Sequence, residues 1–575
     1  MRLNQKWLIS LFCIVSFFAL YLFIFQPGYL LDDDISIISL ASGYLGGKSV
    51  PFLVFSNVIL GFLLNLLYRL PTNINWEFWL FVAVNVVSVW CLVYLILSLP
   101  LTVKWKAMVV LIVLRVDGFL LLSITYTMIA AFAAIAGFCS MLYAAYLKFA
   151  AQRWLYLLGG TLIFVSSLIR IETVPLVLLS IILPLVFMRR LFRLKSLIIS
   201  SAILGFTVFG GYLFNRIYVQ SSSEWDSFYA YNYARTLIHD TPRIHQASIL
   251  SAGKQIGWNE IDYEMFSNWF ISDEKTFSQT NLQYLINHVP GTESDLGSTL
   301  LSHFYFYLNP GSTAAVSYGY VFLIVISLLI VSIHPLLRHI TAPLLLLLFS
   351  VWVLATLLIW TRKLPPQVWY SFLDTVFVFG FFTVVWSKLS SGPFSLPQRI
   401  GNFLKRFEAL AVPSFLVVTL LLTIAQAASV SRTNEEEQSV YRKITSSLSE
   451  LQTQGKLQQN ALIVIPANGI PLEWSDPMIL DFPSIQVLEM GWLAFSPPYD
   501  AALQQYDAYP LLTALYSKDN VYFMTRQSLI SDVLQFIGNH TGVVVRADPV
   551  YAVDYPGLGT GIYTNMVLYK ISRVK

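Results

Sequence analysis

The sequence predicts a polytopic α-helical membrane protein that carries a smaller α/β part outside the membrane. Of the 575 residues, 56% are hydrophobic and only 12% are charged, whereas soluble domains carry about 25% charged residues. The mean hydropathy of +0.64 agrees with this class. The uneven distribution of Lys and Arg among the connections then orients the chain.

Eleven apolar runs approach the roughly 20 residues that a helix needs to cross a bilayer. They lie at 7–25, 76–99, 107–123, 126–147, 154–169, 173–188, 196–217, 316–333, 341–360, 367–387 and 409–430. No small-residue cleavage site follows the first run, so we expect it to remain as a membrane helix. The prediction is therefore a module of about eleven membrane helices over residues 1–430.

Charge is distributed unequally between the two sides of these predicted spans. Fifteen Lys and Arg and one acid occur in the short connections, which are 1–6, 100–106, 148–153, 189–195, 334–340 and 388–408. By contrast, 27 acids and 16 Lys and Arg occur in the three long segments, which are 26–75, 219–315 and 431–575. Because basic loops stay in the cytoplasm, the N-terminus is predicted to be cytoplasmic and the long segments to lie outside.

The long segments have different patterns. In the first, two stretches at 35–45 and 52–69 read as helices that lie along the membrane surface. The second, 219–315, alternates aromatic and acidic residues with helical spacing, and connections of such length usually fold or function.

Residues 431–575 are predicted to form a separate extracytoplasmic α/β domain. A helix that places Ile444, Leu448 and Leu451 on one face opens it. Strand-like runs and a second helix at 528–537 follow. The strand-like runs lie at 461–467, 484–490, 520–524, 541–547 and 561–571.

Three consecutive carboxylates, Asp32, Asp33 and Asp34, stand directly after the first apolar run. Carboxylates beside a bilayer need a solvated edge, a partner or a function. One interpretation is that Asp34 caps the helix that follows it while the others face water. The other is that an acidic pair acts as general base, or holds a divalent cation, where a lipid headgroup would reach.

A second candidate site is the tip of the apolar hairpin 154–188, where Arg170 and Glu172 are the only charged residues. Each arm is slightly short for a full span, so this tip should lie a little below the outer surface. Ionisable residues at such depth are functional candidates, and a structural ion pair is the alternative.

Further cations and acids near or within the later spans are weaker candidates. Arg362 and Lys363 lie between two predicted spans and could hold a lipid phosphate, or they could snorkel from a helix end. Asp374, Arg115 and Asp117 lie within spans, where satisfied buried contacts would equally explain them.

Several function classes find no support in the sequence. There is no Walker A motif, dinucleotide-binding glycine pattern, H-E-x-x-H or G-x-S-x-G. No basic patch interleaved with aromatic residues occurs, so nucleic acid is not an expected partner. Cys13, Cys91 and Cys139 lie in apolar runs without a metal-binding spacing.

The segment "DDDISIISLASGYLGG", after a basic N-terminus and one span, resembles the start of the membrane-embedded GT-C glycosyltransferases. It is also similar to a bacterial group of multispan proteins with an acidic pair, eight residues and a glycine, which Asp33, Asp34 and Gly43 match. The resemblance implies a GT-C-like fold, a polyprenyl-phosphate-linked sugar donor and Asp33 or Asp34 as general base. It leaves Asp32 as solvated surface charge. A WWD-type motif is absent, which disfavours oligosaccharyltransferase activity.

The predicted function is therefore transfer of a lipid-phosphate-linked sugar to a glycan, lipid or protein acceptor outside the bacterial inner membrane. Arg170, Arg362 or Lys363 would offset the charge on the departing phosphate. The sequence points to no cofactor other than a divalent cation that Asp33 and Asp34 could hold. Two alternatives stay open, a transporter or flippase of envelope precursors and a non-catalytic scaffold for envelope assembly. Ionisable residues gather at the outer face and no internal repeat is found, which favours the enzyme.

Overall fold

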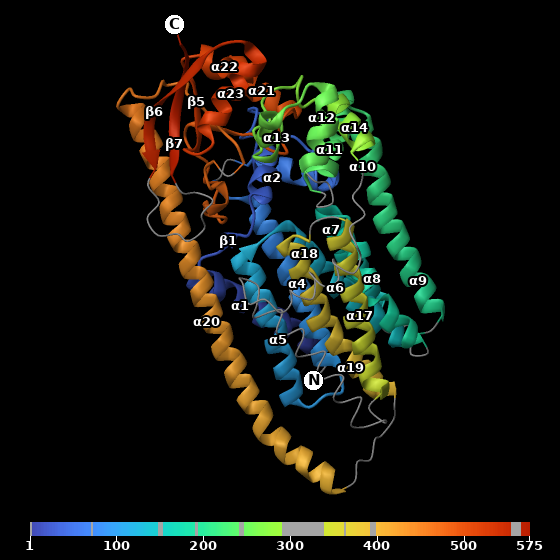
Figure 1. Ribbon diagram of the computed structural model, residues 1–575. Coiled ribbons are helices and arrows are strands. Elements are labelled where there is room, and N and C mark those ends of the chain that lie inside the picture. Colours follow the sequence, from blue (N-terminus) through green and yellow to red (C-terminus); the bar gives the residue numbers. More distant parts are fainter. Residues whose placement is uncertain are drawn as a thin grey trace.

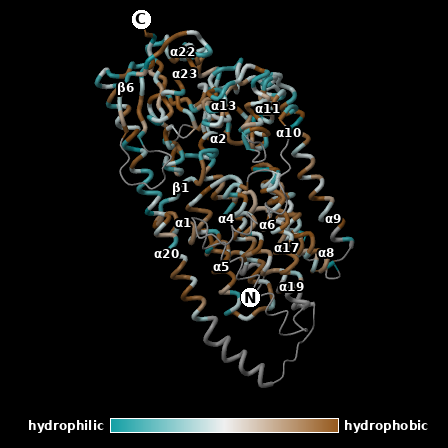
Figure 2. Tube along the Cα trace, in the orientation of Figure 1, coloured by the Kyte–Doolittle hydropathy of each residue, from teal (hydrophilic) through white to brown (hydrophobic). Residues whose placement is uncertain are grey.

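A computed structural model describes residues 3–70, 73–147, 153–189, 192, 194–240, 246–289, 338–361, 364–390, 398–467, 469–553 and 565–574. Long helices form a bundle, and strands β5, β6 and β7 lie at one end of it, where α11 and α13 also lie (Figure 1). Hydrophobic residues follow the bundle helices, while hydrophilic residues are most frequent at that end (Figure 2). We call the region built by α2, α11 to α14 and residues 454–574 the polar end.

Apolar sequence explains the bundle. Its helices are α1 (Leu3–Ile24), α4 (Trp76–Ser98), α5 (Val103–Leu122), α6 (Tyr126–Tyr146), α7 (Arg153–Ile169), α8 (Thr173–Phe187), α9 (Leu194–Leu204), α10 (Gly210–Gln220), α17 (Arg338–Thr361), α18 (Pro366–Asp374), α19 (Gly380–Ser390) and α20 (Gln398–Thr453). Helices thus occur at all predicted span positions within the described residues, and the run 316–333 lies outside them.

Six helices are both long and apolar enough to cross a bilayer, so the chain is a multi-pass membrane protein. They are Trp7–Ile24, Trp76–Ser98, Tyr126–Tyr146, Ile198–Gln220, Ala342–Thr361 and Pro413–Thr453. Shorter apolar helices, including α7 and α8, complete the bundle. One turn of π-helix links α9 to α10 (Gly205–Phe209), and another links α18 to α19 (Thr375–Phe379).

Helix α6 is the centre of the bundle, because its entire apolar window is buried. Its small residues let α7 approach closely. A Cβ added at Gly137 would lie 2.8 Å from the carbonyl oxygen of Gly159, and one at Gly159 would lie 2.7 Å from that of Gly137. This crossing brings the end of α7, and with it Arg170, close to the start of α6.

The first polar segment forms α2 (Asp32–Ser42) and α3 (Val58–Tyr68). Helix α2 begins at the acidic triplet, earlier than the sequence suggested, and Gly43 ends it in a left-handed conformation (φ +82°). A two-stranded parallel pairing of β1 (Gly28–Tyr29) with β2 (Ser123–Ile124) fixes the chain before α2 beside the start of α6. Helix α3 starts later than predicted, where the side chain of Asn57 caps it.

The described part of the second polar segment is largely helical, as its spacing predicts. It contains α11 (Ser223–His239), α12 (Gln246–Gly253), α13 (Glu260–Ser267) and α14 (Gln279–His288), which lie over one end of the bundle (Figure 1).

Near its C-terminus the chain forms a five-stranded mixed sheet in the order β4-β3-β5-β7-β6. The strands are β3 (Leu462–Ile465), β4 (Gln486–Glu489), β5 (Val521–Arg526), β6 (Val545–Val553) and β7 (Met566–Arg573), with α21 (Pro497–Gln505), α22 (Leu511–Ser517) and α23 (Ile530–Thr541) between them. Strands β3, β4 and β5 are parallel, so their carboxyl ends share one edge.

One long helix joins this sheet to the bundle. Helix α20 runs without interruption from Gln398 to Thr453, so the boundary predicted at 430/431 falls inside it. The predicted amphipathic face of its second half is present, because Tyr441, Ile444 and Leu448 are buried in the same cluster as strand residues of the sheet.

Candidate active site

A cavity of about 680 Å³ lies where the bundle meets the polar end. Its walls come from α2, the start of α6, the turn between α7 and α8, α11, α17, α18 and the segments that follow β3 and β4. Parallel strands commonly bind ligands outside their carboxyl ends. Here the loop after β3 supplies Ala467, and the last residue of β4 with the loop after it supplies Glu489 to Leu493. Residues more than 450 positions apart therefore share one cavity.

The acidic triplet divides its side chains between two environments. Asp32 and Asp33 are half-buried and line the cavity, whereas Asp34 is buried and does not. Asp32 is thus not the solvated surface charge that the sequence suggested. The cavity receives Asp32 and Asp33, not the pair Asp33 and Asp34.

Asp34 has a capping geometry, though not at the helix that the sequence suggested. The N-cap of α2 is Leu31, which makes no side-chain capping bond. Instead, the carboxylate of Asp34 accepts a hydrogen bond of 2.8 Å from the backbone N–H of Tyr126, the first residue of α6. A carboxylate at a helix N-terminus offsets the unpaired N–H groups and the helix dipole.

Electrostatics make Asp33 a suitable proton acceptor. Burial, and then the charge of Asp32, raises the pKa of the Asp33 carboxyl to about 7, although Arg170 and Arg235 act in the opposite direction. Burial also raises the pKa of Asp32. A base whose pKa lies near the working pH transfers protons efficiently.

Arg170, at the tip of the hairpin, lines the cavity, as expected if this tip has a functional role. Its Nη1 donates to the hydroxyl of Tyr126 at 2.9 Å and to that of Thr127 at 2.5 Å. Its Nε lies 3.7 Å from Glu172, whose side chain is 71% exposed. An exposed acid neutralises little charge, so Arg170 keeps a net positive charge on the cavity wall.

Arg235 is a second cavity cation, which the sequence analysis did not single out. It is only 2% exposed and lies on α11. Several cavity-lining neighbours recur at helical spacing on this helix and at its C-cap, which are Tyr229, Asn232, Thr236 and Asp240. That spacing was the signal available in "YAYNYARTLIHD".

Two cavity-lining residues have strained backbone. Val54 has φ +64° and Trp269 has φ +61°, a region that β-branched and bulky residues rarely adopt. The backbone N–H of Phe55 donates to the carbonyl of Leu53 at 2.7 Å, so Val54 is the centre of a tight γ-turn. Strain of about 1–3 kcal/mol per residue is typical of ligand-binding and catalytic sites.

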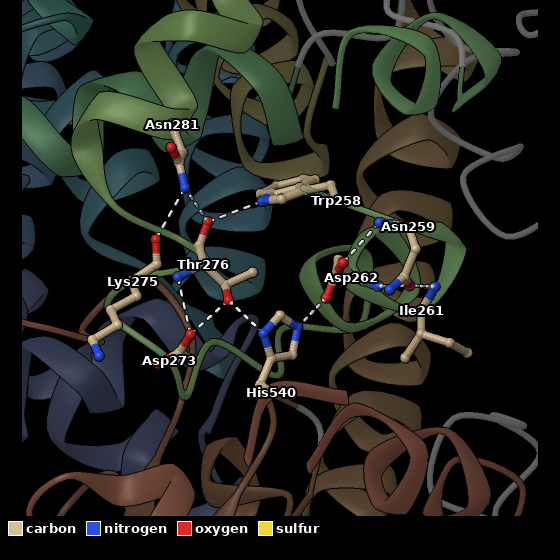
Figure 3. Close-up of polar contacts among 9 residues, drawn as sticks. All are labelled: Trp258, Asn259, Ile261, Asp262, Asp273, Lys275, Thr276, Asn281 and His540. Carbon is tan, nitrogen blue, oxygen red and sulfur yellow. Dashed lines mark hydrogen bonds and ion pairs between the residues drawn. The ribbon is translucent and has the colours of Figure 1, made fainter. Parts of the chain in front are cut away.

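A polar network joins α13 to α23 (Figure 3). His540 Nε2 lies 2.6 Å from Asp262 Oδ1, and Nδ1 lies 3.2 Å from Thr276 Oγ1. The Thr276 hydroxyl donates its own proton to Asp273 at 2.5 Å, so Nδ1 must donate. Both ring nitrogens then carry protons, and the hydrogen bond to Asp262 raises the pKa of His540.

The other candidates lie elsewhere. Arg362 and Lys363 are outside the described residues. Asp117 and Asp374 are buried inside the bundle and do not line the cavity, and Asp117 accepts a hydrogen bond of 2.5 Å from Asn85. Arg115 borders a separate small space instead.

The carboxylates do not make a complete metal site. Among the described residues, no group of three or more His, Cys, Asp or Glu side chains is arranged to hold a metal ion. Asp34, one of the two predicted cation ligands, already accepts from α6. A cation held by Asp32 and Asp33 of α2 would depend on substrate, water or a further cavity residue such as Glu489 for its other ligands.

No protein-family model matches the sequence, and a search of curated proteins finds no match. Among solved structures, the crystal structure of ArnT from Cupriavidus metallidurans in the apo state is similar. The match covers 99% of this chain and 98% of that chain, with 11% sequence identity and a TM-score of 0.41. At this level a likeness concerns the course of the chain and assigns no residue a role.

Proposed function

We propose that this chain is an integral-membrane glycosyltransferase. It transfers a sugar from a polyprenyl-phosphate-linked donor to a glycan, lipid or protein acceptor on the outward side of the bacterial inner membrane. The polar end then faces outward and the N-terminus lies in the cytoplasm, as the charge distribution predicts.

One observation carries the proposal: Asp33 shares a cavity with Arg170 at the junction of an apolar bundle and a polar end. The pKa of about 7 suits a general base that takes the acceptor proton. The Arg170 guanidinium suits a phosphate, which it can bind through a planar pair of donors.

The cavity also matches an amphipathic donor. On the bundle side its lining includes the apolar side chains of Leu176 of α8, Leu358 of α17 and Val368 of α18. On the polar side it is lined by carboxylates and amides, among them Asp33 and Asn232. A prenyl chain would lie along the first wall and its sugar along the second.

The chemistry balances within these groups. Asp33 takes the proton of the acceptor hydroxyl as its oxygen forms a bond to the anomeric carbon. The bond between that carbon and the phosphate oxygen breaks, and the electron pair leaves with the phosphate. Arg170 stabilises the charge that develops there. Attack opposite the leaving group inverts the configuration at the anomeric carbon.

The test is transfer by purified protein in vesicles, with a radiolabelled polyprenyl-phosphate sugar and a membrane extract as acceptor. Asp33→Asn should lower turnover by about 10²-fold or more, while the thermal unfolding temperature stays within a few degrees. The exposed acid Glu436 on α20 provides a matched control, because Glu436→Gln removes a carboxylate that does not line the cavity. Full activity of Asp33→Asn would refute the assignment.

Transport of an envelope precursor is the second candidate, and buried acids inside the bundle favour it. Asp117 and Asp374 each have one carboxylate oxygen without a hydrogen-bond partner among the described residues, and such groups often mark a transport path. Transport predicts that Asp117→Asn blocks precursor movement across vesicles. Glycosyl transfer predicts that this variant retains turnover.

A further inference from the structure

Arg235 is a buried cation whose direct partners are all neutral. Its Nε donates to Asn232 Oδ1 at 3.0 Å and its Nη2 to Thr236 Oγ1 at 3.1 Å. The guanidinium carbon lies 4.7 Å from the centre of the Trp269 ring. Its Nη1 has no hydrogen-bond partner in the part of the chain that the structure describes.

This environment is unusual for a guanidinium. Buried arginines are normally paired with a carboxylate or another anion, because an unpaired buried charge is destabilising by several kcal/mol. Within the described residues, Arg235 forms no ion pair, whereas Arg170 is 3.7 Å from Glu172. The nearest acids act on Arg235 only through space, and they are Asp240 and Asp33.

We infer that Arg235, together with Asn232 and Trp269, binds an anionic group of the acceptor, either a carboxylate or a phosphate. All three residues line the cavity. A planar guanidinium with a free N–H matches the two oxygens of such a group. This inference rests on the proposed function and names the class of its acceptor, an acidic glycan or lipid.

The position of Arg235 separates this anion from the donor phosphate. Arg170 belongs to the turn between α7 and α8, beside the apolar wall that would hold the prenyl chain. Arg235 belongs to α11 at the polar end. Asp33 interacts electrostatically with both guanidinium groups, so an acceptor hydroxyl bound at Asp33 shares the cavity with two cationic sites.

Contacts with the C-terminal sheet hold the Trp269 side of this site. Asn268 accepts a hydrogen bond of 3.1 Å from Nη2 of Arg526, the last residue of β5. Trp269 follows directly, in its strained conformation. A ring fixed in this way keeps the guanidinium in place through cation–π contact.

The test is binding without any donor lipid, so it does not require turnover. Purified protein in detergent is titrated with glucuronate, glucose 6-phosphate and glucose, and tryptophan fluorescence and thermal unfolding are followed. We expect the two anionic sugars to bind and to raise the unfolding temperature, and glucose to bind at least tenfold more weakly. The pair of anionic probes separates a carboxylate from a phosphate preference.

Variants then locate the site. Arg235→Gln should weaken anionic-sugar binding by about tenfold or more, since a charge-assisted bond is lost, and Arg235→Lys should restore part of it. Asp33→Asn should keep binding, so loss of transfer and loss of the anion site are distinguishable. Arg432→Gln, which removes an exposed guanidinium on α20, is the matched control.

Three outcomes would overturn the inference. Glucose could bind as tightly as glucuronate, Arg235→Gln could bind the anionic sugars like the wild type, or Arg170→Gln alone could abolish binding. An unfolding temperature of Arg235→Gln equal to that of the wild type without ligand ensures that weaker binding does not reflect misfolding. If Arg235→Gln is destabilised, the affinity of Arg235→Lys, which keeps the charge, is compared with that of the wild type instead.

Discussion

Replacing Asp32 by Asn tests whether Asp33 is the base. Burial is the larger cause of the raised pKa of Asp33, and the charge of Asp32 is the second. Asp32→Asn removes only the second cause, so the pKa should fall from about 7 but stay above its ordinary value of 3.8. A fall of about one pH unit corresponds to about 1.4 kcal/mol of lost repulsion.

The effect on rate follows from the fraction of Asp33 that is ionised. With a pKa of about 7, roughly a tenth of Asp33 is ionised at pH 6, and a pKa of about 6 would make this roughly half. Turnover at pH 6 should therefore rise about fivefold in Asp32→Asn, and turnover at pH 8 should change by less than twofold. Initial rates of sugar transfer between pH 5 and 9 cover both the acidic range, where the rise is expected, and the alkaline range, where little change is expected.

The same profile can refute the reasoning. An acid limb that stays at the wild-type pH would mean that Asp32 exerts no effect on the base. Loss of transfer at every pH, in protein with normal thermal unfolding, would identify Asp32 itself as the proton acceptor. Glu436→Gln should leave the profile unchanged, because this exposed acid does not line the cavity.

Two further predictions concern residues that hold the site. Asp34→Ala removes the acceptor for the Tyr126 N–H and should lower the free energy of unfolding by about 1 kcal/mol. Asp34→Asn keeps an acceptor and should lower it less. Abolished transfer in a stable Asp34→Asn would contradict a purely structural role for Asp34. The hydrogen bond to Asp262 raises the pKa of His540, and Asp273 adds to the effect. The contribution of His540 to the free energy of unfolding is therefore complete below its ordinary pKa of 6.5 and is lost as the pH rises through the raised pKa. His540→Gln should therefore reduce the dependence of the unfolding temperature on pH between 6 and 9, and an unchanged dependence would assign it to other groups.

The membrane helices could be predicted from sequence because a long apolar run has one dominant solution in a bilayer. The strands of the sheet could also be predicted, since short runs such as "ALIVIPA" are rich in branched residues between turn signals. The domain boundary predicted at 430/431 does not coincide with the end of a helix. Apolar and polar halves of α20 look like separate units, yet nothing in the sequence breaks the helix between them.

The site was harder to predict because it depends on distant packing. Sequence places Asp32, Asp33 and Asp34 side by side, but helical geometry turns each side chain by about 100° from the last. Only the position of α6 decides that Asp34 meets the Tyr126 N–H while its two neighbours reach the cavity. Arg235 was overlooked for a similar reason, since its burial follows from the fold of α11 against Trp269.

The unbroken helix α20 limits how the cavity can admit large molecules. At 1.5 Å per residue its 56 residues extend about 84 Å, and the same rod contacts both α5 in the bundle and the sheet. The sheet cannot lift from the bundle like a hinged cap unless this rod bends or tilts. Donor and acceptor would therefore enter from the sides of the cavity, the lipid donor between membrane helices and the glycan acceptor past α11. Because the two substrates use separate entrances, the order in which they bind does not fix the order in which the products leave.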